Sequence, residues 1–151
     1  MENLVLLNNN NNDNFYWNII NNIRWYFLAR EYGNTASEKV GEYLKEKLEK
    51  EEIENLFNFV VDKRKFLQNR IYSFLSSLKK DERKKYKLGD DSTWDLSSHI
   101  VGMGETTYYY VLHHMEMILE YQNNFQENFE YGFDKALYEY DENNITKMSA
   151  Q

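Results

Sequence analysis

The sequence contains no cysteine and no proline, and only six of its 151 residues are glycine. Without cysteine the chain forms no disulfide and offers no thiolate to zinc, haem iron or an iron–sulfur cluster. Proline is disfavoured inside helices, so its absence suits a chain made mostly of helices. No apolar run exceeds five residues, the length of the run from Trp25 to Ala29, whereas a membrane-spanning helix needs about 20.

Length and composition indicate a single folded domain over residues 1–151. A chain of about 150 residues buries roughly 70% of its unfolded surface. A hydrophobic content of 42%, with 17% aromatics, argues against wholesale disorder. The first residues lack the basic region and the long apolar core of a secretory signal. We therefore expect a cytoplasmic protein with flexible segments at residues 1–14 and 143–151.

Apolar residues recur at three- and four-residue steps, which is the spacing of one face of a helix. The segment over residues 53–78 keeps this spacing for 26 residues, or about 39 Å of helix. No segment of useful length alternates apolar and polar residues as a strand does. We predict an all-α, single-domain bundle of five or six helices with one long central helix, at about 15–32, 35–48, 53–78, 92–101, 108–119 and 129–140.

Local signals mark the ends and weak points of these helices. Thr35–Glu38 and Ser92–Asp95 have the spacing of capping boxes at helix starts. The apolar phase breaks between Leu48 and Ile53, where either a kink or a tight turn is compatible with the sequence. Gly132 weakens the sixth helix. Arg64 interrupts the apolar face of the long helix, so its side chain either reaches to water or pairs with a buried acid.

The net charge of −7 is distributed unevenly along the chain. Residues 1–87 hold 16 Lys and Arg against 13 Asp and Glu, a net charge of +3. Residues 88–151 hold two Lys against 12 Asp and Glu, a net charge of −10. Cations are densest at residues 63–87, where ten Lys and Arg face two acids.

Three interpretations of this asymmetry are open. In the first, the basic and acidic segments pack within a Debye length of about 8–10 Å and neutralise each other. In the second, the acidic segment is a protein-binding face. In the third, residues 63–87 bind nucleic acid, with Tyr72 and Tyr86 beside the cations. The negative overall charge argues against the third, because nucleic-acid-binding modules usually carry net positive charge.

Two pairs of side chains have a spacing that metal sites use. Asp95 and His99 are four residues apart, and His113 and Glu116 are three apart, so each pair shares one helical face. If the two helices packed antiparallel, the four side chains would suit zinc, manganese or iron by ligand type. Capping, surface pairing and a partly buried imidazole explain the same spacing in a chain with 25 acids. We therefore expect no metal and no other cofactor.

Aromatic and acidic residues are concentrated together near the C-terminus. Exposed tyrosines beside carboxylates match protein interfaces, which use rigid aromatic area with a polar tip. No nucleophile–base set of defined spacing is present, so we expect no enzymatic activity. The sequence predicts a small acidic protein-binding module, an inhibitor or a scaffold, whose partner is another protein with a basic surface. Its candidate binding residues are Glu127, Glu130, Tyr131, Asp134, Tyr138 and Tyr140. The alternatives are a metal-binding protein or metal-dependent helical enzyme built on the Asp, His and Glu pairs, and a nucleic-acid binder that uses the basic stretch over residues 63–87.

Overall fold

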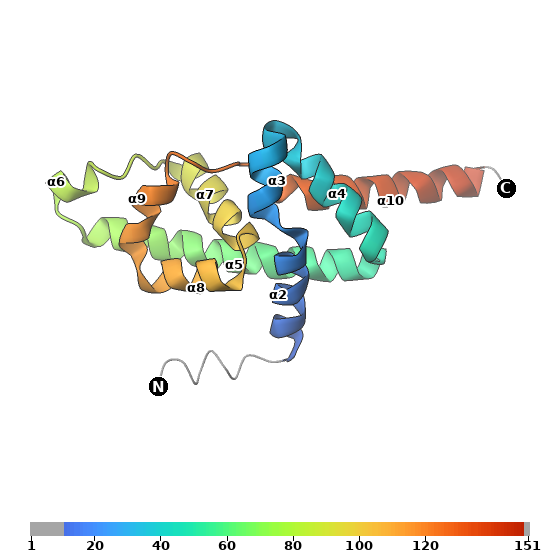
Figure 1. Cartoon of the computed structure of the whole chain (residues 1–151), viewed down its shortest axis with the longest axis horizontal. Coiled ribbons are helices and arrows are strands. Elements are labelled where there is room, and N and C mark those ends of the chain that lie inside the picture. The colour runs from blue at the N-terminus through green and yellow to red at the C-terminus, as the bar shows by residue number, and fades with distance from the viewer. Residues whose placement is uncertain (1–10, 150–151) are drawn as a thin grey trace.

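The computed structural model describes residues 11–149, and the side chains of residues 13–142. Within that range it contains α-helices and two 3₁₀ helices and no strand (Figure 1). The predicted all-α class is therefore confirmed. None of these helices combines the length and the apolar composition that a bilayer crossing needs. In chain order the elements are α2 (Asn11–Ile23), α3 (Trp25–Tyr32), η1 (Gly33–Thr35), α4 (Ala36–Lys47), α5 (Lys50–Ser77), α6 (Lys80–Arg83), α7 (Asp90–Gly102), α8 (Glu105–His113), η2 (Met115–Met117), α9 (Ile118–Tyr121) and α10 (Tyr131–Ser149).

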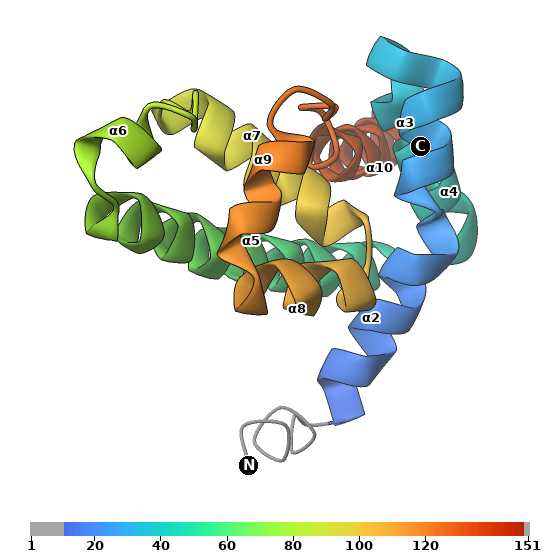
Figure 2. The same cartoon turned by 60° about the vertical axis from the view of Figure 1, so that its left-hand side comes forward.

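The long central helix of the prediction is α5. Ile53, Val60, Leu67 and Ile71 lie along one side of it and are fully buried, as their spacing of seven and four residues requires. α7 and α10 both pack on α5, and α4 packs on α10 (Figures 1 and 2). The burial of this face holds the other helices around α5.

A tight turn, not a kink, separates α4 from α5. Leu48 and Glu49 both have extended backbone angles between the two helices. The backbone N–H of Glu49 donates to the carboxylate of Glu52 at 2.9 Å. The side chain of Glu49 in turn accepts from the first turn of α5, which completes a capping box. The break in apolar phase at this point thus marks a helix start.

Two of the predicted helices are each divided by one residue with non-helical backbone angles. Arg24 has a φ of 59° and separates α2 from α3, within the predicted helix over 15–32. His114 interrupts the predicted helix over 108–119. Ile23 and Trp25 are both buried. In one continuous helix, side chains two residues apart in the sequence point about 200° away from each other, so both could not enter the same core. The left-handed residue between them turns both side chains into the core.

The two predicted capping boxes form differently from the prediction. The hydroxyl of Thr35 donates to the carbonyl of Tyr32 at 2.8 Å and does not cap α4. α7 begins two residues before Ser92, whose hydroxyl accepts from the backbone N–H of Gly89 at 2.8 Å. Ser92 therefore serves as the third residue of the helix. The spacing located both helix starts but misassigned the capping groups.

Glycines allow α4 and α10 to cross closely. A Cβ added to Gly132 would lie 2.6 Å from the Cβ of Val40, which is too close for two carbon atoms. Across the same contact, a Cβ added to Gly41 would lie 3.2 Å from the carbonyl oxygen of Gly132. Gly132 lowers helix propensity, as predicted, but the packing of α10 on α4 requires it.

The helices extend into both segments that the sequence predicts as flexible. Residues 11–14 belong to α2, and residues 143–149 continue α10. The remaining residues of those predicted segments, 1–10 and 150–151, lie outside the described range.

Candidate functional site

Four of the six predicted binding residues are exposed. Glu127 precedes α10, and Tyr131, Asp134 and Tyr138 lie on it at steps of three and four residues, hence on one side. Tyr131 is 58% exposed and Tyr138 is 67% exposed. This side of α10 therefore presents the Asp134 carboxylate between two exposed tyrosine rings.

Glu130 is not part of this exposed surface. Its carboxylate accepts two hydrogen bonds from the Arg64 guanidinium, from Nε at 3.0 Å and from Nη2 at 3.2 Å. Arg64 is 2% exposed and Glu130 is 7% exposed. Glu130 is therefore a buried partner of Arg64, and its prediction as a residue that contacts another protein is wrong for this fold. Of the two alternatives for Arg64, pairing with a buried acid is the one that occurs.

Tyr140 also has an internal role. Its hydroxyl donates to the carbonyl of Leu48 at 2.8 Å and approaches that of Lys45 at 3.3 Å. These carbonyls lie at the C-terminal end of α4, where no following helical turn supplies N–H groups to donate hydrogen bonds to them. The ring is half-buried, so Tyr140 ties α10 to α4 and does not belong to the exposed face.

Trp94 is also exposed beside these residues, and the sequence analysis did not predict it as part of the site. The side chain is 44% exposed. The guanidinium carbon of Arg64 lies 3.4 Å from the centroid of its ring. A tryptophan out of phase with the buried Leu96 and Ile100 of the same helix was the available signal.

Two carboxylates lie on the same side of α7 as this tryptophan. Asp91, Trp94 and Asp95 share one side of α7 because they are three and four residues apart. Burial, together with repulsion from Glu127 and a hydrogen bond to Glu127, raises the pKa of Asp95 to about 6. Burial, with repulsion from Glu130, also raises the pKa of Asp134. We call the set Asp91, Trp94, Asp95, Glu127, Tyr131, Asp134 and Tyr138 the acidic face.

Other C-terminal acids are paired within the fold. Glu139 forms an ion pair with Lys45, and Asp141 forms one with Lys50. The acidic segment is thus partly neutralised by α4 and α5.

The predicted metal ligands do not converge. In the part of the chain with described side chains, no group of three or more His, Asp or Glu has the arrangement of a metal site. Asp95 faces Glu127, whereas His113 and Glu116 are exposed on α8 and η2. His99 is buried, and its Nδ1 accepts from the Trp25 indole at 3.0 Å and from the backbone N–H of Gln126 at 3.3 Å.

The basic stretch over residues 63–87 does not form one surface. Arg64 is buried, and Lys63 lies 3.7 Å from Asp13. Arg83 donates to the carbonyls of Leu75 and Leu78, each at 3.0 Å, and thereby caps α5. The exposed cations that remain near α6 form no ion pair with a described residue. We call this set the basic end: Lys79, Lys80, Lys84, Lys85 and Lys87.

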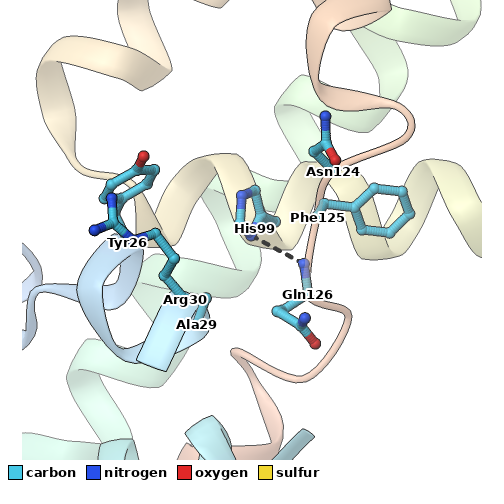
Figure 3. Close-up of a pocket in the computed structure, with 7 residues that line it drawn as sticks. All are labelled: Tyr26, Ala29, Arg30, His99, Asn124, Phe125 and Gln126. Atoms are coloured by element: carbon cyan, nitrogen blue, oxygen red, sulfur yellow. Dashed lines mark hydrogen bonds between the residues drawn. The ribbon is translucent and has the colours of Figure 1, made fainter. Parts of the chain in front are cut away.

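A pocket of about 300 Å³ lies between α3, α7 and the segment that links α9 to α10 (Figure 3). His99 forms its inner wall, and burial lowers the pKa of this histidine to about 4. The imidazole is therefore neutral at neutral pH. The lining residues are Tyr26, Ala29, Arg30, His99, Asn124, Phe125 and Gln126.

Comparison with protein-family models, with curated proteins and with solved structures finds no match to this chain. The acidic face and the pocket are the features of the structure that bear on function.

Proposed function

We propose that the acidic face binds a basic segment of another protein. The observation that carries the proposal is the gathering of carboxylates around Asp95, where Glu127, Asp91 and Glu130 add their repulsion to the effect of burial on its pKa. Neighbouring ionised carboxylates repel one another, and a cation from a partner protein relieves that repulsion.

The aromatic residues of the face support the same proposal. Trp94, Tyr131 and Tyr138 present 44%, 58% and 67% of their surface to solvent. Aromatic rings provide contact area and attract lysine or arginine through cation–π interactions. The carboxylates would mainly increase the association rate and set its dependence on salt.

The experiment titrates the protein with a short lysine- and arginine-rich peptide at several salt concentrations, using calorimetry. The test variant combines Asp91→Asn, Glu127→Gln and Asp134→Asn, and it leaves the buried Glu130 intact. We expect its affinity to fall about tenfold or more, with a smaller salt dependence, since each charge pair is worth up to about 1 kcal/mol when exposed.

A matched control removes three negative charges elsewhere on the surface. Glu31, Glu51 and Asp62 are exposed on α3 and α5 and lie outside the acidic face. Their triple replacement by the corresponding amides should change the affinity less than threefold. If both triple variants lose affinity equally, the peptide responds to net charge alone and the proposal fails.

A further inference from the structure

The pocket between α3 and α7 is rich in hydrogen-bond donors. Arg30 contributes a guanidinium, and Asn124 and Gln126 contribute amide groups. None of the seven lining residues is acidic. A ligand in this pocket therefore meets positive charge and N–H groups without a competing carboxylate.

His99 adds a donor at the inner wall. Its Nδ1 accepts two N–H groups, from Trp25 and from the backbone of Gln126. A neutral imidazole with Nδ1 as acceptor carries its proton on Nε2. No hydrogen bond from a described residue reaches Nε2, although His99 is only 5% exposed. This N–H is therefore available to a hydrogen-bond acceptor in the pocket, such as a ligand oxygen.

Arg30 lines the same pocket as His99. Its guanidinium carbon lies 5.7 Å from the centroid of the Tyr26 ring, and both side chains come from α3 (Figure 3). Guanidinium groups bind carboxylates and phosphates through paired, charge-assisted hydrogen bonds.

We propose that this pocket binds a small molecule carrying a carboxylate or phosphate group, with its oxygens between the Arg30 guanidinium and the Nε2–H of His99. The volume of about 300 Å³ is at the lower end of the range for small-molecule sites. No residue of the acidic face lines the pocket, so this site is independent of the proposed protein-binding surface.

The test uses the full chain with His113→Gln and His114→Gln, which leaves His99 as the single histidine. Both replaced side chains are exposed and lie outside the pocket. NMR then follows the ring nitrogens and the Cε1–H of His99 during titration with benzoate, with inorganic phosphate and with benzamide. Benzamide is the neutral counterpart of benzoate in size and shape.

We expect benzoate or phosphate, but not benzamide, to shift the Nε2 signal in a saturable manner and to raise the pKa of His99. Saturation by benzoate alone assigns a carboxylate ligand, and saturation by phosphate alone assigns a phosphate ligand. Equal binding of benzoate and benzamide, or no saturable shift with either anion at about 50 mM, overturns the proposal.

Two arginine variants provide a matched pair. Arg30→Gln removes the pocket cation, whereas Arg24→Gln removes a neighbouring arginine that stacks on Phe27 at 5.4 Å outside the pocket. We expect Arg30→Gln to weaken anion binding about tenfold or more and Arg24→Gln to change it less than twofold. Equal losses in the two variants would contradict a site built on Arg30. Because both side chains are exposed, the folded protein should survive each change.

Discussion

At the basic end, five lysines between Lys79 and Lys87 are exposed to solvent without an ion pair to a described residue. In the acidic C-terminal region, Glu130 is buried against Arg64, while Glu127 and Asp134 remain exposed. Both regions are dense in charge of one sign along the chain. The five lysines of the basic end all stay at the surface, whereas the acidic region has Glu130 in the interior, paired with Arg64.

This difference determines which charges the fold needs. An exposed lysine keeps its hydration in the folded and unfolded chain, so its removal changes the folding free energy little. A buried carboxylate has lost its hydration and depends on its partner. Charge density in the sequence therefore does not distinguish structural from functional charges, whereas burial does.

The largest expected effect is at the buried pair. Arg64→Met removes the cation and leaves Glu130 buried without its partner, which should lower the free energy of unfolding by about 3–5 kcal/mol. Guanidinium chloride denaturation measures this loss. The exposed neighbour Lys65 is the control, and Lys65→Met should stay within about 0.5 kcal/mol. Equal stability of the two variants would mean that Glu130 does not depend on Arg64.

Asp95→Asn tests the cost of placing the Asp95 carboxylate where burial and the neighbouring carboxylates both disfavour its charge. The pKa of Asp95 is about 6 in the folded protein and about 3.9 when unfolded. The folded state therefore binds more protons between about pH 4 and 6, and this group makes stability fall as pH rises through that window. Asparagine stays neutral, so the variant should be about 1 kcal/mol more stable at pH 7, reduced by partial exposure from the value for a buried group.

The control for Asp95→Asn is the variant itself at low pH. Below about pH 4 the aspartic acid is protonated in both states, so the difference in stability from the unmodified chain should disappear. Thermal denaturation at pH 3.5, 5 and 7 measures the trend. A variant less stable at pH 7 than the unmodified chain would show that Asp95 is stabilised as a carboxylate and would contradict this cost.

Two tyrosines of α10 separate internal from exposed roles within the acidic region. Tyr140→Phe removes the hydroxyl that donates to the carbonyl of Leu48, which should cost about 0.5–1.5 kcal/mol in urea denaturation. Tyr138, two residues earlier and 67% exposed, should tolerate the same change within about 0.5 kcal/mol. The reverse order of the two effects would assign the structural contact to Tyr138.

Local patterns were sufficient for most of the fold. The spacing of Ile53, Val60, Leu67 and Ile71 predicts α5, because one helical face repeats regularly over its length. The division at Arg24 was not predictable from spacing, since three- and four-residue steps continue on either side of it. Its cause is the tertiary requirement that both flanking apolar residues enter the core.

The candidate site was predictable only where a residue's environment is set locally. Exposure of Tyr131, Asp134 and Tyr138 follows from their shared side of α10. Glu130 and Tyr140 have partners 66 and 92 positions away, and no local pattern identifies such partners. The pocket around His99 likewise combines residues from three separate segments, which no local pattern brings together. The sequence spacing suggested a metal ligand at His99, whereas in the structure its Nδ1 accepts hydrogen bonds from Trp25 and Gln126.

The smallest effect is expected at the basic end. Lys84 and Lys85 are exposed and form no ion pair with a described residue. The combined change Lys84→Ala, Lys85→Ala removes two positive charges close to Lys87, and the reduced repulsion should offset any lost packing of the aliphatic chains. We expect the free energy of unfolding to change by less than about 0.5 kcal/mol in urea denaturation. Arg83→Ala is the internal reference, because its guanidinium caps three carbonyls at the end of α5 and its loss should cost about 1 kcal/mol. A loss above about 1 kcal/mol in the double lysine variant would show that the basic end also carries structural charges, and the contrast with the acidic region would then disappear.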